Sequence, residues 1–371
     1  MPTPRINPPF RADHVGSLIR PRALIEARTK LRSGEIAPAA LRALEDSAIR
    51  DAVAMQERVG LQSITDGEFR RNNWRDNFFE SVAGFSDKKI DSSFVFTEYS
   101  GEQRRGMPIP VVTAKLERKK SITADDFVAL RAMTTRTAKA TLPAPSCNHF
   151  FSGDQGLAGS PYRNRKEFFA DVEAIYRAEI ADLAAAGCTY LQIDEVAIAV
   201  LCDPKNQAIV AARGEKADAL IDDYIAAING AVRDRPQSMT VVVHLCRGNQ
   251  GHGQASGGYD AVADRLFNTC NVDGFFLEYD TERAGGFAPL ARMPKDKVAA
   301  LGLISTKLAA LESKDAVKRR LDDAARYIDM ARLCLCPQCG FASSYQTDRF
   351  TADDVERKLA HMVEIAHEVW G

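Results

Sequence analysis

The stretch Met239-Thr-Val-Val-Val-His244-Leu-Cys246 decides how the fold and chemistry of this 371-residue chain are interpreted. Its β-branched run predicts a buried strand. Residues i and i+2 of a strand point to the same side, so this strand would end with an imidazole beside a thiol. Both groups are zinc ligands. A buried histidine next to a structural cysteine gives the same pattern, so the pair indicates a metal site only if further ligands converge on it.

Alternating segments extend in both directions from this strand. Seven more strands are predicted, at residues 10–17, 61–65, 139–146, 189–193, 273–278, 298–305 and 332–336. Helical runs separate most of them, at residues 38–60, 123–138, 165–187, 215–232, 259–271, 315–330 and 351–370. Such alternation predicts a parallel sheet, because parallel strands need crossovers that are usually helical.

Two α/β architectures fit this alternation. An open doubly wound sheet would carry Gly-x-Gly-x-x-Gly in its first turn, and no such motif follows Ser17. A barrel collects its reactive residues at the C-terminal ends of its strands. Here the reactive residues at or just past strand ends are Ser17, Glu68, Asp194, His244, Cys246, Glu278 and Cys339. We therefore predict a single (β/α)8 TIM barrel over residues 1–371. An insertion at 84–120, including a hairpin-like run at 94–99, would separate its second and third strands.

Composition excludes several classes of function. The net charge of −1, with 27% charged residues, gives no electrostatic reason to bind nucleic acid or an anionic membrane. No apolar stretch has the length of a membrane span, and the N-terminus lacks the apolar core of a signal peptide. The eight cysteines have no spacing typical of a small disulfide scaffold. These features predict a cytoplasmic protein with reduced thiols.

Glu278 and Cys339 are the residues that can complete a zinc site with the histidine and cysteine of the central strand. Glu278 ends the apolar run Phe275-Phe-Leu277 and needs a cation or hydrogen-bond donors there. A metal would satisfy it, and so would a salt bridge.

Cys339 belongs to the sequence Cys334-Leu-Cys336-Pro-Gln-Cys339-Gly340, which allows other interpretations. A Cys-x-x-Cys pair can be redox active or form half of a zinc knuckle. A knuckle needs a second pair, which the sequence lacks, and a redox pair usually opens a helix. Cys334 and Cys336 fall within the predicted strand and are expected in the core. Cys339, past the strand end, is the best-placed ligand.

Six short motifs resemble a known family when they are taken together and in order. They are Asp13-His-Val-Gly-Ser-Leu18, Ile64-Thr-Asp-Gly-Glu-Phe-Arg-Arg71, Leu191-Gln-Ile-Asp-Glu195, His244-Leu-Cys246, Phe276-Leu-Glu278 and Pro337-Gln-Cys-Gly-Phe341. The chain resembles the cobalamin-independent methionine synthases, namely their C-terminal catalytic barrel and a group of shorter single-barrel relatives. The resemblance covers nearly the whole chain.

The resemblance implies a zinc ion, and its implied ligands are His244, Cys246, Glu278 and Cys339. A free thiol has a pKa of about 8.5, and zinc coordination deprotonates it. Four protein ligands fill a tetrahedron, whereas catalytic zinc usually keeps one position open. We therefore hypothesise that a substrate sulfur displaces Glu278 or makes the zinc five-coordinate.

The resemblance also implies an amino-acid pocket. Glu68 and Asp194 would hold the substrate ammonium, and the Ser17 backbone would meet its carboxylate. Two carboxylates facing one small pocket repel each other unless a cation lies between them, and an ammonium is such a cation. The alternatives are a salt bridge from Glu68 to Arg70 or Arg71, and helix capping at residues 194–195.

The chain departs from the family in two ways that concern the methyl donor. It has one barrel where full-length members have two, and the missing half helps to hold a polyglutamylated folate. The family histidine that is proposed to protonate the leaving group is also absent, because the corresponding stretch is Leu303-Ile-Ser305-Thr306. Ser305 lies near the histidine's position. His149 and His252 are the candidate replacements, and each fits an ordinary pocket or loop histidine as well.

Aromatic and basic residues near the predicted mouth could serve the donor. Trp74 and Phe151 could stack a flat molecule, or simply pack. Arg70, Arg71 and Arg75 could bind an acidic tail, or face solvent.

Three functions are therefore open. The first is a zinc-dependent S-methyltransferase that converts a small amino-acid thiol, homocysteine above all, into methionine. Its donor would be 5-methyltetrahydrofolate or another molecule, including one carried by a corrinoid or other donor protein. The second is another zinc-thiolate alkylation, such as a lyase-like enzyme joining a thiol cofactor to an epoxide. The third is a non-catalytic zinc-binding barrel. The sequence leaves the donor, the thiol and the oligomeric state open.

Overall fold

A six-stranded parallel sheet forms the centre of the fold, in the order β12-β11-β10-β9-β8-β7. The computed structural model describes residues 5–97, 103–105, 108–249, 255–345 and 350–371. The strands are β7 (Ala140–Pro143), β8 (Tyr190–Glu195), β9 (Thr240–Leu245), β10 (Gly274–Glu278), β11 (Val298–Ile304) and β12 (Leu333–Pro337). Every strand in this sheet is fully buried apart from Thr240 at the start of β9. Such burial on both faces explains the continuous apolar runs of the sequence.

A two-stranded parallel pair extends this arrangement beyond β7. Strand β1 (Ser63–Ile64) pairs with β6 (Thr137–Ala138), and β6 is separated from β7 by Lys139 alone. The prediction of a strand at 61–65 is therefore close to the observed one. The predicted helix at 123–138 is wrong in its second half, because α4 (Ala124–Arg131) ends early and the β-branched Thr137 begins a strand.

The predicted first strand, residues 10–17, is not a regular strand. One parallel bridge joins Ala12 to Leu335 of β12. On its other side the segment meets β1 through side chains, since Ser63 donates to the Asp13 carboxylate and Thr65 donates to the Gly16 carbonyl oxygen. The Asp13 carboxylate also accepts backbone N–H groups of its own segment, which competes with a regular ladder. The observed architecture is thus an α/β fold around a parallel six-strand sheet.

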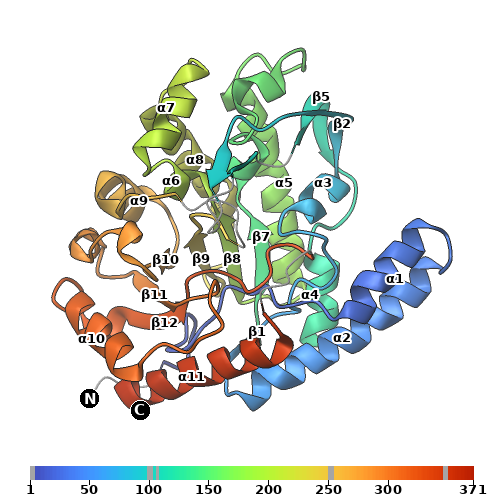
Figure 1. The fold of residues 1–371 in the computed structure, drawn as a ribbon. Coiled ribbons are helices and arrows are strands. Elements are labelled where there is room, and N and C mark those ends of the chain that lie inside the picture. The colour runs from blue at the N-terminus through green and yellow to red at the C-terminus, as the bar shows by residue number, and fades with distance from the viewer. Residues whose placement is uncertain (1–4, 98–102, 106–107, 250–254, 346–349) are drawn as a thin grey trace.

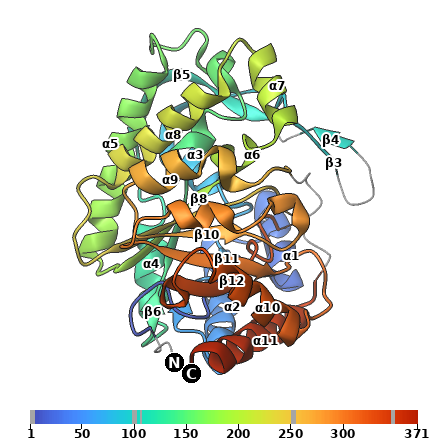
Figure 2. The same cartoon turned by 90° about the vertical axis from the view of Figure 1, so that its left-hand side faces the viewer.

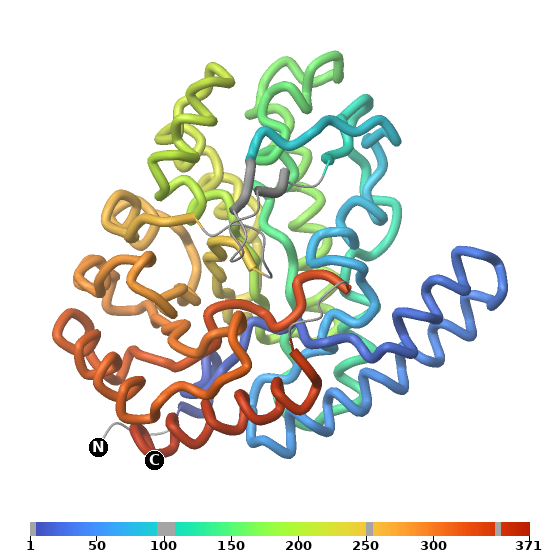
Figure 3. The backbone as a smooth tube through the Cα atoms, in the orientation of Figure 1, coloured from blue at the N-terminus to red at the C-terminus, as the bar shows by residue number. Residues whose placement is uncertain are grey.

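Helices lie around the outside of the strands (Figure 1). They are α1 (Arg22–Arg32), α2 (Pro38–Arg58), α3 (Asp76–Ser81), α4 (Ala124–Arg131), α5 (Arg165–Ala185), α6 (Ala197–Val200), α7 (Pro204–Ala212), α8 (Ala217–Val232), α9 (Ala263–Thr269), α10 (Lys314–Ala324) and α11 (Ala352–Trp370). Single-turn 3-10 helices occur at Pro145–Asn148, Gly153–Leu157, Tyr259–Ala261, Glu282–Ala284, Ala288–Arg292 and Met330–Arg332. The pair α1–α2 projects from the body, as the tube in Figure 3 also shows.

Local sequence explains where several helices begin and end. Helix α11 starts with a capping box in which Thr351 and Asp354 bond each other's backbone N–H groups. Asn164 is the N-cap residue of α5, and its side chain accepts the Glu167 backbone N–H. The predicted strand at 139–146 ends at Pro143, because a short 3-10 helix begins at Pro145. The predicted helix at 259–271 is split into a 3-10 turn and α9.

Antiparallel strands lie between β1 and β6 in the chain. Strand β2 (Val82–Ile90) pairs with β5 (Ile109–Arg118), and β3 (Val95–Thr97) pairs with β4 (Gln103–Arg105). In Figure 2 the β3–β4 pair stands out from the rest of the molecule.

Two buried apolar clusters stabilise the fold. The larger one packs the helices onto the strands. The smaller one joins side chains of β8 to β12 and of the segment before α1, namely Val15, Tyr190, Val242, Phe276, Val298, Ala300, Cys334 and Cys336. Because strand residues alternate between faces, the residues that follow this smaller cluster by two positions share its side of the sheet. That side is where His244 and Glu278 point.

Candidate metal and substrate site

Three predicted metal ligands meet at the C-terminal ends of the strands. His244 is near the end of β9, Cys246 directly follows that strand, and Cys339 lies in the loop after β12. Their ligand atoms all lie within 4.8 Å of one another. The Cys246 and Cys339 sulfur atoms are 3.5 Å apart. All three residues are at least nine-tenths buried.

The imidazole of His244 is buried beside the Cys246 thiol. Neither Nδ1 nor Nε2 has a partner in the part of the chain that the structure describes. Buried polar groups are usually paired, so such a residue needs an explanation. One nitrogen and two sulfur donors are also the set that zinc prefers. The residues present therefore fit a zinc ion.

The three side chains change each other's proton affinity. A hydrogen bond from Cys339 lowers the pKa of the Cys246 thiol to about 6, and it raises the pKa of Cys339 well above its ordinary value. Burial alone would lower the pKa of His244, but the neighbouring Cys246 outweighs burial and raises it. The cluster therefore favours a thiolate at Cys246, which is the form that binds metals.

Glu278 is not among the residues whose ligand atoms lie within 4.8 Å of one another. One carboxylate oxygen accepts the Arg247 backbone N–H at 2.9 Å, and the other is 2.8 Å from Arg283 and 3.9 Å from Lys307. Burial would raise the pKa of Glu278, but the charges of Lys307 and Arg283 lower it. Glu278 thus makes the salt bridge that the sequence left as its alternative. Arg283 and Lys307 were not predicted, although both are cations that follow strand ends.

Glu68 and Asp194 form a second polar group at this end. Both carboxylates are buried. Burial raises the pKa of Glu68, and burial together with the nearby Glu68 charge raises the pKa of Asp194 to about 7. One oxygen of Glu68 has no hydrogen-bond partner within the described ranges. Two such carboxylates favour a cationic ligand.

The sequence left two alternatives for these residues, a salt bridge for Glu68 and helix capping at 194–195, and the structure shows each only in part. The nearest guanidinium nitrogen to the Glu68 carboxylate belongs to Arg71, at 3.7 Å, which is longer than a hydrogen bond. Helix capping belongs to Glu195, which accepts the backbone N–H of Ile198 and the hydroxyl of Ser146. Asp194 instead accepts one bond from Gln192, at 2.7 Å.

Backbone geometry places Glu68 and Ser17 close to the cysteine loop. Glu68 has a φ of 60°, which is rare outside glycine and is found where function requires strain. The Ser17 carbonyl oxygen accepts the Phe341 N–H at 2.9 Å. A Cβ on Gly340 would lie 1.9 Å from the Ser17 hydroxyl oxygen, so any larger residue would displace the Ser17 side chain.

The remaining predicted residues have varied surroundings. Trp74 is half-buried, and its backbone N–H donates to the Ser343 carbonyl oxygen at 3.0 Å. Phe151 is buried, with the Arg75 guanidinium 5.1 Å from its ring centre. Ser305 is half-buried at the end of β11, where its N–H donates to Glu312.

The two candidate replacement histidines differ in what the structure describes. Both ring nitrogens of His149 have partners, the Tyr224 hydroxyl and the Asp154 carboxylate, each at 3.0 Å. His149 and Asp154 also form a group with Glu215, but Arg165 pairs with both carboxylates and competes with a metal there. His252 lies outside the described residues.

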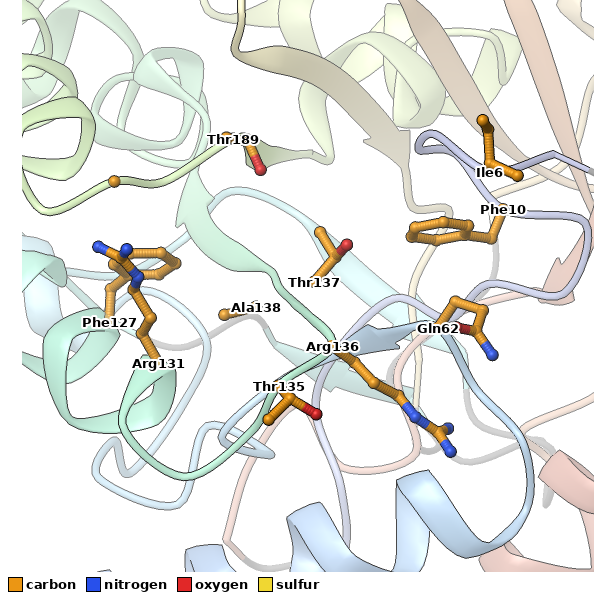
Figure 4. Close-up of a pocket in the computed structure, with 11 residues that line it drawn as sticks. Ile6, Phe10, Gln62, Phe127, Arg131, Thr135, Arg136, Thr137, Ala138 and Thr189 are labelled. Carbon is orange, nitrogen blue, oxygen red and sulfur yellow. The ribbon is translucent and has the colours of Figure 1, made fainter.

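A cavity of about 420 Å³ lies at the opposite, N-terminal end of the strands (Figure 4). Its lining includes Phe10, Gln62 and Thr189, which precede strands or the bridged segment. Two arginines also line it, but Arg131 donates to the Ala186 carbonyl oxygen and Arg136 donates to that of Leu61. These two cations already bond the backbone, unlike the unpartnered imidazole of His244 at the other end of the strands.

The chain is similar in sequence and in fold to proteins of one family. A profile of the family described as "Cobalamin-independent synthase, Catalytic domain" matches residues 10–368. The uncharacterized protein YxjG of Bacillus subtilis is 39% identical over 370 residues, covering 99% of this chain and 96% of that protein. A solved structure from Listeria monocytogenes, described as a "Putative Vitamin-B12 Independent Methionine Synthase", has a TM-score of 0.77 at 32% identity, and the match covers 98% of both chains.

A longer relative carries a named activity. The 5-methyltetrahydropteroyltriglutamate–homocysteine methyltransferase of a Synechococcus strain is 23% identical over 367 residues. These cover 98% of this chain but 43% of that protein. Within the described ranges, no helix is both long enough and apolar enough to span a membrane.

Proposed function

Because the chain belongs to the family of cobalamin-independent synthase catalytic domains, we propose that it is a zinc-dependent S-methyltransferase that converts homocysteine into methionine. Relatives named as methionine-synthase-type methyltransferases support the reaction class. The substrates would be two small molecules, the thiol and a methyl donor.

One observation carries the proposal. A buried histidine with two unpartnered ring nitrogens lies within 4.8 Å of two cysteine sulfurs, at the same strand ends as two buried carboxylates. His244, Cys246 and Cys339 would hold zinc. A bound zinc ion would keep a substrate thiol deprotonated at neutral pH, which makes it a nucleophile.

The chain's own residues would orient the substrate. Glu68 and Asp194 would receive the homocysteine ammonium, because each gains a cation that compensates for its buried charge. The Ser17 backbone would meet the carboxylate. Glu278 would be the fourth protein ligand, and its contacts with Arg283 and Lys307 would hold its carboxylate when it is not bound to zinc.

The donor side of the proposal is less specific. 5-Methyltetrahydrofolate is the first candidate, with Trp74 and Phe151 as stacking residues, and a corrinoid or another donor protein is the alternative. His149 is a poor proton donor here, because its ring already bonds Tyr224 and Asp154 and burial lowers its pKa. The proton for the leaving group is therefore left to another group or to water.

The proposal also includes an architecture and a location. We infer that residues 1–371 form one (β/α)8 barrel with an insertion at 84–120, closed where Ala12 bridges β12 and where Asp13 bonds Ser63 of β1. A cytoplasmic location fits the eight free cysteines.

A methyl-transfer assay tests the activity. The zinc-loaded protein is incubated with homocysteine and, in turn, with 5-methyltetrahydrofolate, methylcobalamin and S-methylmethionine, and methionine is measured. Methionine formation with one donor is expected. Absence of product with all three would contradict the proposal.

The other two functions predict different results. An epoxide-thiol lyase has no need for an ammonium pocket, so replacing Asp194 would leave its rate unchanged. In a non-catalytic barrel, Cys339→Ser would lower stability, and there would be no activity to lose. The paired carboxylates with raised pKa values favour the amino-acid thiol over both.

A further inference from the structure

Arg75 is a buried cation whose guanidinium makes no ion pair with a described carboxylate, although the charge of the adjacent Asp76 lies nearby. The residue is 6% exposed, and its guanidinium has no hydrogen bond or ion pair to any described residue. Its neighbour Asp76 bonds the Asn73 side chain instead. Burying an uncompensated charge is costly, so such residues are rare unless a partner arrives from outside.

Two aromatic rings hold this guanidinium in place. Its central carbon is 5.1 Å from the Phe151 ring centre and 5.8 Å from that of Phe79. Aromatic faces stabilise a cation without neutralising it. The planar nitrogen fork is therefore positioned and still available for an anion.

Arg213 provides the internal comparison. Its guanidinium also lies near a phenylalanine ring, 5.3 Å from the centre of Phe94. It pairs with the Glu215 carboxylate at 2.8 Å and with the Ser93 hydroxyl at 3.2 Å. The same packing in this chain thus occurs with an anionic partner at Arg213 and without one at Arg75.

Arg75 lies on the metal end of the fold. The residues before it pair with the loop that follows Cys339. The Trp74 backbone N–H donates to the Ser343 carbonyl oxygen, and Asn73 forms an antiparallel β-bridge with Ser344. On the other side, Phe151 follows β7, and the nearby Cys147 sulfur is 3.8 Å from the Asp194 carbonyl oxygen. A ligand reaching Arg75 would therefore extend from the homocysteine site.

A cavity gives space beside this arginine. It measures about 400 Å³ and lies between α3 and the β2–β5 pair. Its lining residues are Asn73, Arg75, Asp76, Phe79, Glu80, Lys89, Pro108 and Pro110. The two carboxylates in this lining oppose an anion, so only a group that reaches the guanidinium itself gains from binding here.

We propose that Arg75 binds a carboxylate or phosphate group of the methyl donor, beside the stacking ring of Phe151. This inference rests on the proposed function. It makes the donor an anionic molecule and makes Arg75 a determinant of donor specificity rather than of thiol activation. Carboxylate and phosphate both match the guanidinium fork, so the experiment separates them.

Calorimetric titration tests the proposal with defined probes. 5-Methyltetrahydrofolate carries two glutamyl carboxylates, 5,6-dimethyltetrahydropterin carries the same ring without them, and inorganic phosphate tests the second anion. Each is titrated into the wild type, Arg75→Met, Arg75→Lys and the matched control Arg213→Met. Zinc content and homocysteine affinity are measured for all four proteins.

Loss of a charge-assisted pair predicts that Arg75→Met weakens binding of the anionic probe by about 10- to 100-fold, with Arg75→Lys in between. The pterin, zinc and homocysteine should bind all variants alike. If Arg75→Met lowers the affinity for 5-methyltetrahydrofolate, the group that Arg75 binds is a carboxylate. If it lowers the affinity for inorganic phosphate, that group is a phosphate. Equal binding by Arg75→Met and wild type, or no anion binding by wild type, would overturn the inference. Failure of zinc or homocysteine to bind wild type would instead count against the proposed function.

Arg213→Met separates this effect from general damage. It should lower thermal stability, because Glu215 loses a partner, and leave probe binding unchanged. Arg75→Met should lower stability less than Arg213→Met does, because it leaves no paired carboxylate behind. Equal loss of anion binding in both variants would contradict a specific role for Arg75.

Discussion

Two buried polar clusters lie at opposite ends of the same sheet, and they differ in how well they are paired. At the N-terminal end, the Asp13 carboxylate accepts bonds from the Ser63 hydroxyl at 2.7 Å, the Tyr190 hydroxyl at 2.8 Å and the Lys139 ammonium at 3.2 Å. At the C-terminal end, His244 has no partner among described residues, and one oxygen of Glu68 has none either.

This difference is what we expect between a structural cluster and a cluster that binds a ligand. Both clusters are equally deep, so burial alone does not tell them apart. A satisfied network contributes to stability, whereas unpaired buried groups persist where a ligand completes them. In α/β folds with parallel strands, ligands bind at the carboxyl ends of the strands, which agrees with this division.

The largest expected effect separates two cysteines of one motif. Cys339→Ser should reduce bound zinc from one ion per chain to near zero and lower methyl transfer by about 1000-fold or more, as expected for loss of a metal ligand. Cys336→Ala, in the interior apolar cluster, should retain zinc and activity. Metal analysis and the methionine assay check both variants. Retention of zinc by Cys339→Ser would remove Cys339 from the ligand set.

Lys139→Met tests the opposite cluster. It leaves the Asp13 charge buried without its cation, which should lower the free energy of unfolding by about 3–5 kcal/mol. Chemical denaturation measures this loss. The folded fraction should bind zinc as the wild type does, and weaker zinc binding would mean that the two ends are coupled.

Glu195→Gln tests a buried carboxyl group that caps α6 and directly follows Asp194 in the chain. Burial raises the pKa of Glu195 to about 7 in the folded protein from an ordinary value of 4.5. The folded state therefore binds more protons, and this stabilisation is complete below pH 4.5 and is lost as pH rises through 7. The variant should remove about 3 kcal/mol of that pH dependence. Unfolding curves between pH 4 and about 8 measure it, and an unchanged slope would contradict the assignment.

The smallest effect concerns the ammonium pocket. Asp194, with a pKa of about 7, must be ionised to pair with homocysteine ammonium, so affinity should increase as pH rises through 7. Asp194→Asn should weaken homocysteine binding by about tenfold and remove this pH dependence. Calorimetry at several pH values provides the measurement. Pairing through Glu68 alone would instead leave the variant's affinity unchanged.

The sequence predicted the residues whose positions depend on local pattern. The apolar run before His244 forms a buried strand, and period-two alternation puts that histidine beside Cys246. Cys339 joins them because parallel strands end at one edge. Those three positions follow from the strand pattern and the order of strands.

Contacts across the sheet could not be predicted in the same way. Glu278 bonds Arg283 and Lys307, and the choice between a metal and a cation depends on where the loops after β10 and β11 turn. Lys139 pairs with Asp13 from 126 positions away, which no local pattern reports. The segment at 10–17 has strand-like composition, but side-chain bonds of Asp13 replace its ladder.

Zinc K-edge X-ray absorption tests the central claim most directly. The spectrum of the zinc-loaded protein should give two sulfur neighbours, from Cys246 and Cys339, together with nitrogen or oxygen. Addition of homocysteine should increase the number of sulfur neighbours to three as Glu278 gives way. A sulfur count that stays unchanged with saturating homocysteine would contradict thiol activation at this site.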